Sequence, residues 1–144
     1  MNRILVATDG SEGADRAVDY AAHRAKADGA ELVIVNVAGG SLPEKVFKAF
    51  THSQQAWFEE LLSSVSADIL AKAAERARSI GVSAIHLESR TGDVAETLIE
   101  IAQEKQANAI VAGKRGAGRV AELLLGSVSQ KLVSLAPLPV TIIP

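Results

Sequence analysis

Five short runs of apolar and β-branched residues recur along the chain, and longer helical patterns separate them. The runs cover residues 4–8, 31–37, 84–88, 109–112 and 140–143. Alternation of short strands with longer helices is typical of βαβ units, whose strands pair in parallel. The first two runs are almost continuously hydrophobic, as expected for strands that are covered on both faces. The sequence therefore predicts an α/β fold built on an open, doubly wound parallel sheet with helices on both faces.

The segments between these runs carry helical periodicity. Residues 14–25 place small apolar side chains on one stripe, which ends near Gly29 and favours close packing on the sheet. Residues 43–80 are helical again, with a break expected at the polar stretch 51–55 and an end at Gly81.

Two further helices are expected in the second half of the chain. One covers residues 93–106, with acidic residues in its first turn, where the helix dipole favours them. The last is expected to begin at Ser127, because residues 127–130 match a capping box, and to end before Pro137.

Length and composition restrict the class of protein. A chain of 144 residues with 48% hydrophobic residues has the size and core of one domain, spanning 1–144. The net charge of -2 and the scattered basic residues favour neither a nucleic-acid partner nor a membrane partner. There is no cysteine, and the apolar run at residues 4–7 is too short for a signal-peptide core. We expect a cytoplasmic protein.

The loop after the fourth run is rich in glycine and in basic residues. It begins Gly113-Lys114-Arg115-Gly116-Ala117-Gly118 and leads through an apolar stretch to Gly126-Ser127. Glycines leave backbone N–H groups uncovered, so a phosphate oxygen can approach the main chain. The start of the next helix adds unpaired N–H groups and about half a positive charge. The loop therefore has the features of an anion site, although glycines alone also serve simply to turn a chain.

Known nucleotide motifs fit this loop unequally. A Walker A loop requires a lysine between glycine and Ser/Thr, and Gly126-Ser127 has none. Residues 116–121 match the dinucleotide pattern GxGxxG/A, but no acidic residue follows Leu123 that could bind a ribose. A nicotinamide or flavin dinucleotide is therefore a weak alternative.

The spacing Gly113-x2-Gly116-x9-Gly126-Ser127 resembles the phosphate loop of the ATP-binding branch of the universal stress protein family. The resemblance extends over the whole chain, including residues 4–11, 92–95 and 136–140. It implies a Rossmann-like, five-stranded sheet of order 3-2-1-4-5. It also implies ATP, with Mg bound through the nucleotide phosphates.

The family pattern, transferred residue by residue, implies an ATP site that joins three loops. Asp9 would lie beside the ribose, and Val37 against the adenine. The backbone of Gly113, Gly116 and Gly126 and the hydroxyl of Ser127 would surround the phosphates. The full set of expected ATP-binding residues is Thr8, Asp9, Val37, Gly113, Lys114, Arg115, Gly116, Gly118, Gly126, Ser127, Val128 and Ser129.

Some of these residues have a second interpretation or depart from the family. Asp9 precedes Gly10-Ser11 and could equally form an Asx-turn or cap a helix. Lys114 stands where the family more often has a small hydroxyl residue, and Asn36 replaces a frequent histidine. The side chain of Lys114 would either strengthen phosphate binding or point to solvent.

Enzymatic chemistry has little support in the sequence. The histidines His23, His52 and His86 lack metal-ligand spacing, and no hydrolase nucleophile is indicated. No catalytic residue is assigned, and Asp9 contacts a metal only if Mg arrives with ATP. A phosphoacceptor site would need a carboxylate cluster around Asp9, and only Glu12 is near in sequence.

Two functional hypotheses remain. The first is an ATP-binding regulator or sensor in stress response, with at most slow hydrolysis. The second is an interaction protein of the same fold whose loop stays empty. In either case the apolar strand Val140 to Ile143 is expected at a sheet edge, and the resemblance implies a homodimer through it. Pro139 and Pro144 could instead protect that edge.

Overall fold

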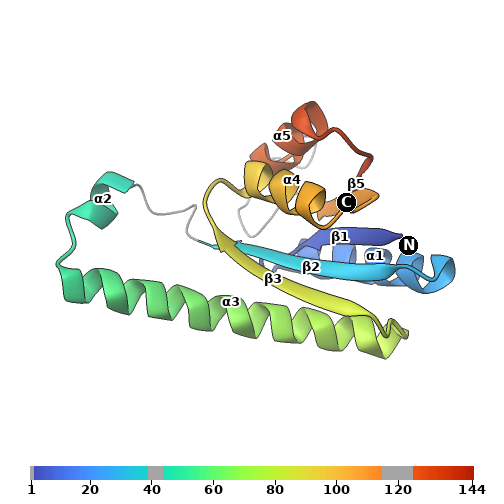
Figure 1. Cartoon of the computed structure of the whole chain (residues 1–144), viewed down its shortest axis with the longest axis horizontal. Coiled ribbons are helices and arrows are strands. Elements are labelled where there is room, and N and C mark those ends of the chain that lie inside the picture. The colour runs from blue at the N-terminus through green and yellow to red at the C-terminus, as the bar shows by residue number, and fades with distance from the viewer. Residues whose placement is uncertain (1, 39–43, 115–124) are drawn as a thin grey trace.

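The computed structural model describes residues 2–38, 44–114 and 125–144. They form one parallel sheet in the order β3-β2-β1-β4-β5, which confirms the predicted α/β class and strand order (Figure 1). The strand bounds are Arg3–Ala7 for β1, Glu31–Ala38 for β2, Ile85–Thr91 for β3, Ala109–Gly113 for β4 and Val140–Ile143 for β5. The third strand is longer than its apolar run suggested, because β3 continues at the sheet edge with polar residues.

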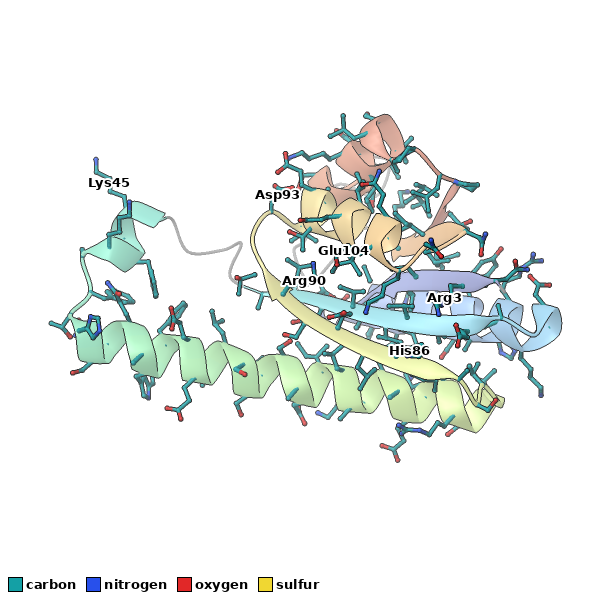
Figure 2. The ribbon with its side chains drawn as sticks, in the orientation of Figure 1. Arg3, Lys45, His86, Arg90, Asp93 and Glu104 are labelled. Atoms are coloured by element: carbon teal, nitrogen blue, oxygen red, sulfur yellow. The ribbon has the colours of Figure 1, made fainter. Side chains whose placement is uncertain are left out.

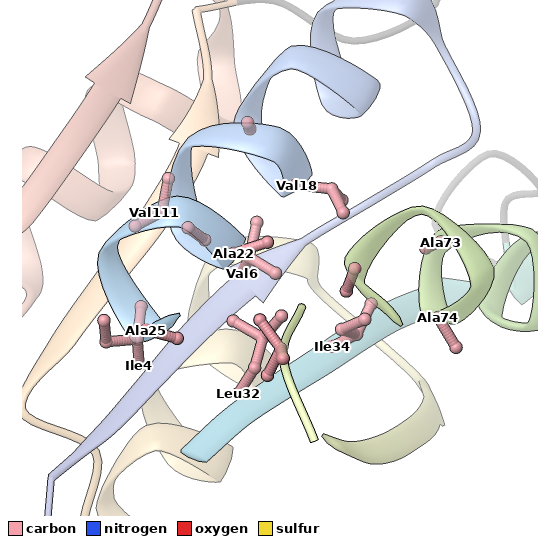
Figure 3. Close-up of a cluster of buried hydrophobic side chains, with 14 of the residues drawn as sticks. Ile4, Val6, Val18, Ala22, Ala25, Leu32, Ile34, Ala73, Ala74 and Val111 are labelled. Atoms are coloured by element: carbon pink, nitrogen blue, oxygen red, sulfur yellow. The ribbon is translucent and has the colours of Figure 1, made fainter. Parts of the chain in front are cut away.

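Two hydrophobic clusters cover the two faces of the sheet. Along β1 and β2, alternate residues belong to different clusters, as the two-residue period of a strand requires. The cluster that includes Val6 and Ile34 packs against α1 (Glu12–Asp28) and α3 (His52–Ile80), as Figure 3 shows. The cluster that includes Leu5 and Val33 packs against α4 (Val94–Glu104) and α5 (Ser127–Leu135).

Helix α1 confirms the prediction of close packing by small side chains. All six residues of its apolar stripe are buried: Ala14, Ala17, Val18, Ala21, Ala22 and Ala25. The Ser11 hydroxyl caps its start by accepting from the Ala14 N–H at 3.2 Å. Gly29 ends it at φ +64°, a left-handed conformation that suits glycine.

Helix α3 starts at the break that the polar stretch predicted. Thr51 and Gln54 form a capping box that separates it from α2 (Glu44–Lys48). Within α3 the buried residues begin at Ser66, so the preceding half extends beyond the sheet (Figure 1). Phe47, Phe50 and Phe58 join α2 to this half, with ring centroids 5.8–6.0 Å apart.

Helix α5 begins at Ser127 and ends before Pro137, as predicted, but its start is not capped as expected. The N-cap is Gly126, Ser127 is the first helical residue, and no side chain caps the helix. The capping-box prediction is therefore wrong. The reason is that Gly126, which has no side chain, takes the N-cap position, and the Gln130 Nε2 donates to the Leu125 carbonyl at 3.1 Å.

Candidate functional site

A cavity of about 290 Å³ opens at the carboxyl ends of β1 and β4. These two strands are neighbours in the sheet, although β2, β3 and helices α1 to α4 lie between them in the chain. The loop after β1 leads to α1 on one face, whereas the loop after β4 leads to α5 on the other. The strand order therefore reverses here, which is where open α/β sheets bind ligands.

The β1 side of the cavity consists of Thr8 and Asp9. The Thr8 hydroxyl accepts from the Gly10 N–H at 3.1 Å, and the Asp9 carboxylate accepts from the Ser11 N–H at 3.0 Å. The second bond is the Asx-turn that sequence reasoning left open, while the cap of α1 comes from Ser11. Gly10 has φ +81°, which permits this tight turn. These two bonds and the glycine give the loop a defined conformation.

The opposite side of the cavity is held by Ser129. This side chain is 2% exposed, and its hydroxyl lies 2.8 Å from the Gly113 carbonyl and 2.9 Å from the Lys114 carbonyl. A hydroxyl has one proton, so the two carbonyls share a single donor. The Gly126 N–H also donates to the Lys114 carbonyl, at 2.9 Å. Lys114 and Gly126, two residues of the glycine-rich loop, are therefore bonded to each other.

The start of α5 supplies the electrostatics of the cavity. Gly126, Ser127, Val128 and Ser129 all line it. The first N–H groups of a helix have no partner within the helix, and the dipole adds about half a positive charge there. Ser127 is exposed to solvent and also lines the cavity. This part of the cavity suits an anion.

The remaining wall is apolar. Val35 and Val37 contribute from β2, and Val94 and Leu98 contribute from α4. These side chains belong to the core cluster on this face or pack against it. The cavity thus combines an apolar surface with backbone amides and the carboxylate of Asp9, the combination found in sites for small organic ligands.

Lys131 links the two helices that begin beside the cavity. Its ammonium lies 3.1 Å from the Asp93 carboxylate and 3.2 Å from that of Glu96, at the start of α4. The pKa of Asp93 is lowered mainly by the hydrogen bond from the Glu96 N–H and secondly by the hydrogen bond from Lys131. The pKa of Lys131 is raised mainly by its hydrogen bond to Asp93 and secondly by its hydrogen bond to Glu96. Figure 2 shows Asp93 where the chain turns from β3 into α4.

Most of the residues expected to bind ATP meet at this cavity. Eight of the twelve line it: Thr8, Asp9, Val37, Gly113, Gly126, Ser127, Val128 and Ser129. Lys114 adjoins this set, and its N–H donates to the Ile143 carbonyl at 2.7 Å. Arg115, Gly116 and Gly118 lie outside the described residues.

Sequence reasoning missed six lining residues: Ala7, Ala14, Val35, Val94, Leu98 and Ala112. Each belongs to an apolar run or stripe, so the sequence pattern predicted only that its side chain is part of the hydrophobic core. The signal that could have found them is position, because Ala7, Val35 and Ala112 stand close to the carboxyl ends of central strands.

The structure also bears on metals and membranes. Within residues 2–38, 44–114 and 125–144, no group of three or more His, Asp or Glu side chains is placed to hold a metal ion. Across those same ranges, no helix has the length and apolar character needed to span a bilayer.

Comparison with known proteins identifies the family. The model of the universal stress protein family matches residues 1–144. Universal stress protein YxiE of Bacillus subtilis is 34% identical over 147 residues, which cover 99% of both chains. The protein belongs to the universal stress protein family.

Solved structures agree with that assignment. UspA from Lactobacillus plantarum superimposes with a TM-score of 0.80 at 26% identity, covering 99% of this chain and 97% of that one. A universal stress protein in complex with cAMP superimposes with a TM-score of 0.73 at 28% identity, covering 99% and 95%.

Proposed function

We propose that this universal stress protein binds ATP, with Mg on the phosphates, and acts in the cytoplasm as a nucleotide-dependent regulator or sensor in stress response. The adenine would lie against Val37, and the ribose beside Asp9. The phosphates would lie between the glycine-rich loop and the start of α5. Such a protein responds to nucleotide supply by changing its population of bound and free states.

The observation that carries this proposal is the meeting of an apolar wall with a helix N-terminus in one cavity. Val37 and Leu98 offer a surface for a base, and the N–H groups at the start of α5, in Ser127–Ser129, offer donors for phosphate. Asp9 stands on the same cavity, where a carboxylate can accept hydrogen bonds from ribose hydroxyls.

The related structure in complex with cAMP supports an adenine nucleotide as the ligand class. It leaves the number of phosphates to be determined. A triphosphate carries more negative charge than a cyclic monophosphate does, and the start of α5 favours anions. We therefore favour ATP over cAMP for this chain, and we expect Mg-ATP to bind more tightly.

Hydrolysis is expected to be slow. Asp9 is the one carboxylate that lines the described part of the cavity, and its Oδ1 already accepts from Ser11. A base that is engaged in a turn is poorly placed to activate water. We expect turnover well below the roughly 1–100 per second of kinases.

The proposal extends to assembly. We propose a homodimer that forms through β5, because the two edges of the sheet differ in chemistry. The β3 edge carries His86, Glu88 and Arg90, whereas Val140–Ile143 has no charged residue. Charged residues protect an edge strand from pairing, and an apolar edge favours it.

Calorimetry with the purified chain tests ATP binding. The wild type should bind Mg-ATP saturably. Gly116→Val should weaken binding by at least about tenfold, equivalent to about 1.4 kcal/mol, because a β-branched side chain blocks the approach of phosphate to the main chain. Ser83→Val is the matched control. Ser83 is an exposed residue just before the edge strand β3, and it is not among the residues that line the cavity.

Three outcomes are informative. Loss of binding in Gly116→Val but not in Ser83→Val supports the proposal. Tighter binding of cAMP than of Mg-ATP would replace ATP by the cyclic nucleotide. Absence of binding by the wild type would favour the interaction protein with an empty loop.

A further inference from the structure

Asn36 is a buried polar residue in an apolar strand. It is 5% exposed and follows four fully buried apolar residues of β2, Leu32–Val35. A buried amide is costly unless it is hydrogen-bonded, so its place in this strand needs a specific partner. The Asn36 Nδ2 has that partner in the Thr8 carbonyl, at 2.9 Å.

The side chain of Asn36 lies on the face of the sheet opposite the cavity. Its neighbours Val35 and Val37 line the cavity, and successive strand residues point to opposite faces. Asn36 is paired in register with Ser89, whose hydroxyl bonds to that of Ser66 in α3 at 2.6 Å. Asn36 therefore cannot touch a ligand in the cavity directly.

The hydrogen bond from Asn36 extends the bonding between β2 and β1 beyond their paired register. The paired register of the two strands ends at Ala7 and Val35. Beyond it, the Thr8 N–H donates to the Val35 carbonyl at 2.9 Å, and the Thr8 carbonyl accepts from the Asn36 side chain. Both peptide groups that flank Thr8 are thus bound to β2.

The peptide group that Asn36 binds also contains the N–H of Asp9. A peptide group is planar, so fixing the Thr8 carbonyl fixes the plane from which Asp9 departs. Asp9 lines the cavity and carries the proposed contact to ribose. We propose that Asn36 is a positioning residue, which acts through the Thr8–Asp9 peptide to orient Asp9 for the nucleotide. This inference rests on the proposed function.

The direct test compares nucleotide affinities in a double-mutant cycle. Asn36→Leu fills the site without a donor and should weaken Mg-ATP binding about tenfold, since it leaves the Thr8 carbonyl free to rotate. In an Asp9→Ala background the same substitution should change affinity less than about twofold, because the residue through which it acts is gone. A merely structural role for Asn36 would give the same loss in both backgrounds.

Ser66→Ala provides the matched control. It removes the hydroxyl bond to Ser89, on the same face of the sheet, from a side chain that is 1% exposed. It should lower stability and leave the affinity for Mg-ATP within about twofold of wild type. If Ser66→Ala weakens binding as much as Asn36→Leu does, the specific role of Asn36 is refuted.

A second measurement needs no nucleotide. Hydrogen exchange of the amides of residues 9–11 should be faster in Asn36→Leu than in wild type, and unchanged in Ser66→Ala. If Asn36→Leu does not fold, Asn36→Ser is used, since its shorter side chain lacks the reach of the amide. Equal exchange in the wild type and the Asn36 variant would overturn the inference.

The outcomes separate the two proposals. Wild-type binding that is lost in Gly116→Val but unchanged in Asn36→Leu refutes the role of Asn36 and keeps the proposed function. Absence of wild-type binding refutes both the function and the nucleotide role of Asn36.

Discussion

At the scale of single residues, the site is prepared by side chains that bond to the main chain. Thr8, Asn36 and Ser129 are three of the five polar residues that are buried in the described ranges. Each bonds to backbone groups of the loops after β1 and β4. A cavity that is organised in this way loses less conformational entropy when a ligand binds.

Asp93 allows a prediction of pH dependence at the same scale. Its pKa is lowered in the folded protein by the Glu96 N–H and then by Lys131. A carboxylate with a depressed pKa contributes stability that is complete above its unfolded pKa of about 4 and is lost as the pH falls through the folded value.

Asp93→Asn keeps a good N-cap but removes the charge. The variant should lower Tm by at most about 3 °C at pH 7, because an exposed ion pair contributes little. The difference from wild type should vanish in thermal melts recorded below the folded pKa of Asp93. A difference that persists unchanged at acidic pH would contradict the assignment.

At the scale of elements, α3 and α4 differ in how they are anchored. The first half of α3 has no buried side chain, and Trp57 is 63% exposed. Helix α4 instead buries Leu98 and Ile101 completely. The same local change should therefore have different effects in the two helices, because tertiary packing supplies most helical stability.

Removal of each N-cap tests this difference. Asp93→Ala should lower the Tm of the whole protein by about 2–4 °C, since a cap contributes about 1 kcal/mol. Thr51→Ala removes the same kind of cap but should leave Tm nearly unchanged and speed hydrogen exchange over residues 52–58. Equal losses of Tm in the two variants would show that the start of α3 is coupled to the core.

For the whole molecule, the proposed dimer depends on the outer edge of β5, the last strand in the order of the sheet. The Pro139 and Ile143 carbonyls accept from Ile110 and Lys114 of the β4 side. Because the backbone groups of successive strand residues point to alternate sides, those of Ile142 point to the open edge. Two β5 strands related by a twofold axis could therefore pair through this residue.

Light scattering measures this assembly. The wild type should have twice the chain mass of 15.0 kDa. Ile142→Pro removes an outward N–H and should give a monomer, whereas Ile142→Ala removes only the side chain and should leave the dimer. A wild type that is monomeric at micromolar concentration would refute the interface, and two dimeric variants would place it elsewhere.

Local sequence patterns were sufficient to predict the elements and the class of fold. The patterns that indicated them are local: the apolar strand runs, the alanine stripe of α1, the break before α3 and the glycine spacing of the loop after β4. Each pattern lies within the element or loop that it predicts. The spacing of Gly113 and Gly126 also indicated the family, which comparison with known proteins confirmed.

The way in which distant segments meet follows from the packing of the whole chain. This packing brought Thr8 and Asp9 next to Gly113 and Gly126, because pairing of β1 with β4 depends on contacts across more than one hundred residues. It also engaged Ser129 with the loop after β4 and bonded Asn36 to Thr8. Such bonds leave no periodic pattern in the sequence, because the two partners lie far apart in the chain. The free energy of a buried polar group also depends on the surroundings that the fold provides.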